Sequence, residues 1–178
     1  MNMQEAQLVS HEEMFNVRAN KDAITEASAY PTIPTDKYVL QFTKWEGKKY
    51  EDGRLIVRIT ATALKDGNKK GTLNFSISPE LKRTATGKPD KNFKLYAQLQ
   101  GLTHPESKNG GENPSVVEVM ERALSFPVAA FVSETFKGDL DPITGQAAWN
   151  DARTPEAAKE FREKGHKAYN FVQSLSRA

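Results

Sequence analysis

The fold is decided by three stretches of alternating residues: KYVLQFTKW (Lys37–Trp45), RLIVRITATAL (Arg54–Leu64) and TLNFSIS (Thr72–Ser78). A period of two places apolar side chains on one face of a β-strand and polar ones on the other. Asp52-Gly53 and Asp66-Gly67 separate the stretches, and Asp-Gly pairs are typical of hairpin turns. The sequence therefore predicts an antiparallel meander of three strands. Tyr38, Leu40 and Phe42 are expected on its buried face, with Trp45 and Ile56 on the opposite one.

Capping patterns predict three helices after the meander. Asp90 precedes a helix to Gln100, Ser115 and Glu118 have capping-box spacing before a helix over 116–124, and Thr154-Pro155 begins a helix to about 164. Alternation predicts a strand over 128–136, a hairpin turn over 138–145 and, favoured over a helix, a last strand over 168–175. The residues from 46 to 53 and from 66 to 71 are expected to form turns.

This order of elements indicates a mainly β fold with added helices. The favoured architecture is a closed β-barrel of the oligonucleotide/oligosaccharide-binding (OB) type with α+β character, and the alternative is an open antiparallel α+β sheet. Residues 33–178 are expected to form this OB-like domain, because the prolines at 31 and 34 impose an extended lead-in. Residues 1–32 are expected to form a partly ordered N-terminal arm with one short helix capped by Ser10.

The composition excludes several classes of protein. The chain has 178 residues and no cysteine, which rules out disulfides, thiol catalysis and thiolate metal sites. No run of about 18 apolar residues is present, and the N-terminus lacks the basic and apolar regions of a signal peptide. We therefore expect no membrane association and a cytoplasmic location.

No constellation of residues in the sequence indicates catalysis. His11, His104 and His166 lack metal-ligand spacing, and no nucleophile-elbow motif is present. Asp139 and Asp141 resemble the start of a calcium loop, but the later acidic ligand is missing. The expectation is a protein that is not an enzyme, with no catalytic residues, no metal and no cofactor.

Positive charge is concentrated in one third of the chain. Residues 37–94 carry fourteen Lys or Arg against six Asp or Glu, whereas residues 1–36 have a net charge of −4 and residues 95–178 a net charge of −2. Cations along the phosphates and flat rings under the bases are what single-stranded nucleic acid requires. The candidate nucleic-acid-binding residues are Lys44, Trp45, Lys48, Lys49, Tyr50, Arg54, Arg58, Lys69, Lys70, Lys82, Arg83 and Lys88. The alternative interpretation is a solvated basic surface, with Trp45 packed in the core.

Glycine, proline and core positions between residues 33 and 102 follow a loose pattern. It comprises Ile33-Pro34-x-x-x-Tyr38, Tyr50-x-Asp52-Gly53-Arg54-Leu55, Asp66-Gly67-x-x-x-Gly71, Ser78-Pro79-x-Leu81 and Leu99-x-Gly101-Leu102. This pattern resembles small phage-encoded OB-fold proteins that bind single-stranded DNA. The resemblance implies sequence-independent binding during DNA replication or recombination, in the host cell cytoplasm. It also implies replication or recombination proteins as partners and leaves a homo-oligomer open.

The chain departs from such proteins at its end, because many of them carry an acidic C-terminal tail and this chain ends QSLSRA. The acidic N-terminal arm is the segment that could recruit partners instead. The leading hypothesis is a non-catalytic single-stranded-DNA-binding protein. That hypothesis predicts that Trp45→Ala weakens binding of single-stranded DNA without unfolding the protein. The alternative is a structural or protein-binding phage module, such as a virion component or an inhibitor of a host enzyme.

Overall fold

The computed structural model describes residues 8–20 and 32–178. The chain divides into two units, Met1–Pro31 and Thr32–Ala178. In the first unit, α1 (His11–Phe15) begins where the Ser10 side chain accepts a hydrogen bond from the Glu13 N–H. The short helix expected in the arm is therefore confirmed, and none of its residues is buried.

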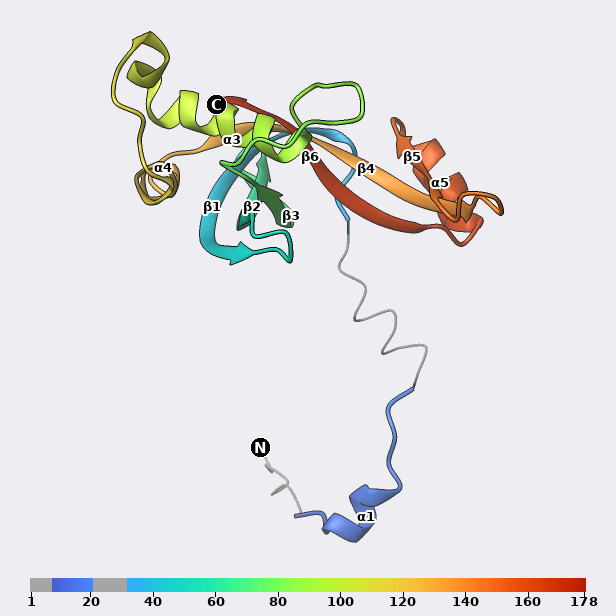
Figure 1. The fold of residues 1–178 in the computed structure, drawn as a ribbon. Coiled ribbons are helices and arrows are strands. Elements are labelled where there is room, and N and C mark those ends of the chain that lie inside the picture. The colour runs from blue at the N-terminus through green and yellow to red at the C-terminus, as the bar shows by residue number, and fades with distance from the viewer. Residues whose placement is uncertain (1–7, 21–31) are drawn as a thin grey trace. The chain divides into compact units, whose positions relative to one another are not determined.

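The second unit is built on one antiparallel sheet of six strands (Figure 1). The strands are β1 (Asp36–Lys49), β2 (Leu55–Lys65), β3 (Asn68–Ile77), β4 (Val128–Leu140), β5 (Ala147–Ala152) and β6 (Lys167–Arg177). The order is β3-β2-β1-β4-β5, and β6 pairs with β4. The first half of β4 pairs with β1 and the second half with β5, while β6 runs beside both halves. All the predicted strands form, including the last one.

Three helices and one 3₁₀ turn accompany the sheet in the described chain. They are α3 (Lys91–Thr103), η1 (Pro105–Asn109), α4 (Val116–Ala123) and α5 (Pro155–Glu163). The predicted caps are confirmed: the Asp90 carboxylate accepts from the Phe93 N–H at 3.1 Å, and Ser115 and Glu118 form a reciprocal capping box. None of the helices that the structure describes is long and apolar enough to cross a membrane.

The main core lies between the inner face of the meander, the start of β4 and the helices α3 and α4. Tyr38, Leu40 and Phe42 are buried as expected, and they pack with apolar residues of α3 and α4. A smaller second core forms where α5 covers the other end of β4 and is centred on Phe136 and Ala158. In Figure 1, β4 and β6 connect these two ends of the folded unit.

A β-bulge at Thr43 changes the face of Trp45. The register between β1 and β2 shifts between Phe42 and Lys44, so Trp45 lies opposite Ile59 on the inner face. Its ring is partly buried and packs against the main core. The prediction that Trp45 faces outward is therefore wrong, because simple alternation does not survive an inserted residue.

Ile56 also differs from its predicted exposure, since it is fully buried. The chain after β3 folds back beside the start of β2. There the Ser78 hydroxyl donates to the Leu55 carbonyl at 2.8 Å, and the Leu55 N–H donates to the Glu80 carboxylate at 2.7 Å. Alternation within the strand does not predict this returning segment, which lies beside Leu55, the residue before Ile56.

The two turns of the meander are tighter than predicted. Asp66 and Gly67 both have positive φ, of 52° and 75°, as a two-residue hairpin turn requires. Lys69 and Lys70 therefore lie on β3, not in a turn, and the residues from 46 to 49 extend β1. Gly71 is required by close packing, because a Cβ there would lie 2.8 Å from the Ile33 side chain.

Candidate nucleic-acid interface

The outer face of the meander carries polar and charged side chains in rows across the strands. Lys44 lies opposite Thr60, and in the next row Glu46 lies opposite Arg58. Residues that pair across strands share a face, so Lys44 and Arg58 are neighbours on this surface. Both are exposed, and no carboxylate among the described residues forms an ion pair with either of them.

The turn between β1 and β2 places a ring and a cation together. Tyr50 is 50% exposed, and its N–H donates to the Arg54 carbonyl at 3.0 Å. The Arg54 guanidinium forms an ion pair with Asp52 at 2.6 Å. This hydrogen bond lowers the pKa of the Asp52 carboxyl and raises the pKa of Arg54. The charge of Arg54 is therefore partly compensated within the turn.

The remaining predicted cations lie on β3 and on the loop before α3. Lys69 and Lys70 are exposed on β3. The loop folds back at a bridge between Arg83 and Pro89, and the Arg83 guanidinium donates to the Gly87 carbonyl at 2.9 Å. Lys82 and Lys88 are exposed on this loop.

The ten predicted cations are spread over both faces of the meander, its turns and the loop before α3, and we call them together the basic surface: Lys44, Lys48, Lys49, Arg54, Arg58, Lys69, Lys70, Lys82, Arg83 and Lys88. Within residues 8–20 and 32–178, only Lys48 and Arg54 of this set form ion pairs, with Glu46 and Asp52. An unpaired surface cation is free to contact a phosphate without first breaking an ion pair. The basic surface therefore has the charge that a polyanion requires, and Tyr50 is the predicted ring exposed beside it.

A second group of rings, on β5 and β6, is not among the binding residues that the sequence patterns predict. Trp149, Tyr169 and Phe171 form what we call the aromatic platform. The Trp149 ring meets the Tyr169 and Phe171 rings edge to face, with centroids 5.6 and 5.7 Å apart. Trp149 is 49% exposed and Phe171 is 37% exposed. These exposures leave much of both rings open to solvent.

Lysines surround the aromatic platform. The Lys91 ammonium lies 5.1 Å from the centre of the Phe171 ring, and the Lys167 ammonium lies 5.3 Å from that of Tyr169. Lys137 of β4 pairs with Trp149 on one side and Lys167 on the other. Partial burial lowers the pKa of Lys91, while the charge of Asp151 opposes this change. The platform is thus bordered by cations, although residues 95–178 are acidic overall.

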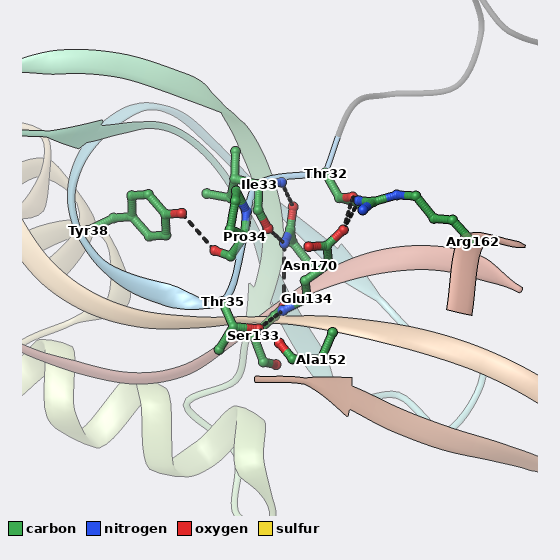
Figure 2. Close-up of polar contacts among 10 residues, drawn as sticks. All are labelled: Thr32, Ile33, Pro34, Thr35, Tyr38, Ser133, Glu134, Ala152, Arg162 and Asn170. Atoms are coloured by element: carbon green, nitrogen blue, oxygen red, sulfur yellow. Dashed lines mark hydrogen bonds and ion pairs between the residues drawn. The ribbon is translucent and has the colours of Figure 1, made fainter. Parts of the chain in front are cut away.

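A network of polar contacts anchors the lead-in to β1 on the opposite face of β4 (Figure 2). Glu134 is 2% exposed, accepts from the Thr32 hydroxyl at 2.9 Å and forms an ion pair with Arg162 of α5. The Arg162 guanidinium also lies over the Phe136 ring, 5.4 Å from its centre. A buried carboxylate is stable only with such partners, so this ion pair joins α5, β4 and the lead-in.

Asn170 completes this anchor. Its side-chain amide donates to the Ile33 carbonyl at 2.8 Å, and its side-chain oxygen accepts from the Ile33 N–H at 2.9 Å. Tyr38 donates from its hydroxyl to the Pro34 carbonyl at 2.6 Å, as Figure 2 also shows. Burial, and next the charge of Glu134, raise the pKa of Tyr38. These groups satisfy one another, so we interpret the network as structural.

The described chain also contains a shallow cleft of about 640 Å³ between α3 and the segment from η1 to α4. Its polar lining includes Gln100, Lys108 and Asn113, and it shares no residue with the basic surface. Among residues 8–20 and 32–178, no group of three His, Asp or Glu side chains is placed to hold a metal ion.

No protein-family model, curated protein or solved structure matches this chain. The resemblance to phage single-stranded-DNA-binding proteins thus stays an expectation.

Proposed function

We propose that the chain is a non-catalytic protein that binds single-stranded DNA without sequence preference. The observation that carries this proposal is the basic surface, where most cations lie exposed and without acidic partners. Phosphates bound by lysine and arginine release counterions, which drives binding to any sequence. The side chains of the basic surface would contact phosphates, and Tyr50 would stack on a base.

The strand order supports an OB-like fold for this function. β1 pairs with β2 along most of its length and with β4 at its start, and the helices α3 and α4 lie between β3 and β4 in the sequence. If the sheet is followed from β3 through β2, β1 and β4 to β6, its two end strands, β3 and β6, also contact each other. A partly open barrel with these five strands has the architecture that binds oligonucleotides in OB folds.

Trp45 has a smaller role in the proposal than its position in the sequence indicates. Because the ring packs against the core, it offers less of its surface to a base than Tyr50 does. The proposal keeps the phage replication or recombination context and the cytoplasmic location as expectations from the resemblance. Replication or recombination enzymes are the partners that this context implies.

A second candidate is a protein-binding module, and the N-terminal arm favours it. Met14 and Phe15 are exposed on α1 beside Glu12 and Glu13. An acidic segment with exposed apolar side chains is suited to docking on another protein. This candidate accounts for the arm but leaves the basic surface without a partner.

A titration of fluorescently labelled oligo-dT of about thirty nucleotides tests the proposal, with anisotropy measured at low and moderate salt. Duplex DNA of equal length is the control. The expected result is binding that prefers the single strand and weakens steeply with salt, with a slope of about −0.7 per phosphate contact on a log–log plot. Absence of binding at low salt would refute the proposal and leave the protein-binding candidate.

A further inference from the structure

The aromatic platform is fixed by a polar layer on the same face of β4. Ser133 and Thr135 lie opposite Phe171 and Tyr169 in the register of β4 and β6. Their hydroxyls are 3.1 Å apart, and Thr135 also donates to the Asp151 carboxylate at 2.6 Å. Both residues are polar, and their side chains lie on the face of β4 that α5 does not cover, yet both are buried.

This arrangement gives the rings one structural role, which is to cover the hydroxyls of β4. This role alone does not explain three rings. The buried hydroxyls of Ser133 and Thr135 already have hydrogen-bond partners in each other and in Asp151, so they need no further group above them. This role also does not account for the large exposed part of Trp149 or for the lysines around it. The exposed rings are in edge-to-face contact and are held on two strands that both pair with β4, so they are preorganised for a flat ligand.

The surrounding charge selects the chemistry of that ligand. Lys91, Lys137 and Lys167 border the rings, and Asp151 is the acid that lies among them. A ligand with flat rings joined by negative groups matches both features. A single nucleic-acid strand has this composition, because each base has a π-face and each linkage a phosphate.

We propose that the aromatic platform is a base-stacking site, where Trp149 and Phe171 stack on bases of a single strand and Lys91, Lys137 and Lys167 contact the adjoining phosphates. This inference rests on the proposed function and adds a binding site that the basic surface does not include. The rings of this second site lie on β5 and β6, whereas most cations of the basic surface lie on the meander and on the loop before α3. A single DNA strand that occupies both surfaces has its phosphates bound on the meander and its bases stacked on the rings of β5 and β6.

The test separates stacking from phosphate binding. Wild type, Trp149→Ala and Ile143→Ala are titrated with oligo-dT of about thirty nucleotides and with an abasic strand of the same length. Ile143 is 93% exposed in the same hairpin, so its substitution is the matched control for loss of an exposed apolar side chain. Trp149→Ala is expected to weaken oligo-dT binding about tenfold and to leave binding of the abasic strand unchanged. Ile143→Ala is expected to change neither.

Two results distinguish the failure of this inference from that of the proposed function. In the first result, wild type binds oligo-dT, and folded Trp149→Ala either binds it with the same affinity or loses affinity for oligo-dT and the abasic strand to the same extent. The platform is then not a stacking site. If wild type binds neither strand, the proposed function itself is wrong.

A second measurement leaves Trp149 in place, so it does not depend on the folding of Trp149→Ala. In a Trp45→Phe variant, Trp149 is the remaining tryptophan, and stacking on a base should quench its fluorescence as oligo-dT binds. Unchanged Trp149 emission at saturating oligo-dT would overturn the inference.

Discussion

The meander of β1, β2 and β3 and the β4–β6 region form one sheet, but they are buried in different ways. In β2, buried and more exposed residues alternate from Val57 to Ala63, so one face stays open to solvent. In β4, every residue from Val132 to Phe136 is buried, because α5 covers one face and the aromatic platform covers the other. Exposed charge can therefore collect on the meander, whereas a charge between Val132 and Phe136 of β4, such as Glu134, needs a partner beside it.

The largest expected effect is on stability, at the buried end of β4. Arg162→Met removes the cation from Glu134 and from the Phe136 ring but keeps a long apolar side chain on α5. We expect it to lower the free energy of unfolding by about 3 kcal/mol, because a buried carboxylate is left without its counter-charge. Urea denaturation measures the change. Lys159→Met is the control, since this exposed pairing with Glu163 on α5 contributes at most about 0.5 kcal/mol.

The double variant Glu134→Gln/Arg162→Met checks the reason for that loss. Removal of the buried charge should restore most of the stability. If the double variant is as unstable as Arg162→Met, the loss comes from packing and not from the charge of Glu134.

A smaller difference is expected between the two predicted rings of the meander. Trp45→Ala should lower the free energy of unfolding by about 2 kcal/mol, less than for a fully buried ring, because the indole is only partly enclosed. Tyr50→Ala should change it by less than about 0.5 kcal/mol, since the ring is exposed in a turn. Thermal or urea unfolding compares the two variants. Equal stability of both variants would place Trp45 back on the surface.

Trp45 also shows how far the sequence predicts this molecule. Alternation and capping residues act over a few positions, so they were sufficient for the strands, the helices and the inner face up to Phe42. No local pattern indicates the bulge at Thr43. The bulge exchanges the inner and outer faces for the residues after it, so that Trp45 lies on the inner face. The cations of the meander were predicted because neighbouring strands are also neighbours in the sequence.

The aromatic platform could not be found in this way. Trp149 comes from β5 and Phe171 from β6, and they meet only through the register that each strand makes with β4. Acidic residues outnumber basic ones in this part of the sequence, which hides the lysines around the rings. Glu134 gave no signal either, because its burial depends on Arg162 and Thr32, which are far from it in the chain.

The next prediction concerns binding to the open face of the meander. Lys44→Gln/Arg58→Gln removes two neighbouring exposed cations and should reduce the slope of log affinity against log salt by about 1.4 for oligo-dT. Stability should be unchanged, because neither side chain is buried. Lys159→Gln/Lys164→Gln on α5 is the control, since these two lysines are paired with glutamates and should leave the slope as it is. An unchanged slope in the first variant would remove Lys44 and Arg58 from the interface.

The smallest effect is expected in the turn between β1 and β2. Because Arg54 lowers the pKa of Asp52, this pair stabilises the fold above the ordinary carboxyl pKa. The contribution is lost as the pH falls through the lowered pKa, below about pH 4. An NMR titration should show the Asp52 carboxyl returning towards its ordinary pKa in Arg54→Gln. If the pKa stays low without Arg54, the hydrogen bond is not its cause.

Photocross-linking tests most directly the claim that one strand uses both surfaces of the sheet. Oligo-dT carrying 5-bromodeoxyuridine is bound to the full chain, irradiated, and the adducts are located by mass spectrometry. The account predicts adducts at Tyr50 on the meander and at Trp149 or Phe171 on the aromatic platform. Adducts confined to one of the two surfaces, or to the cleft between α3 and α4, would contradict it.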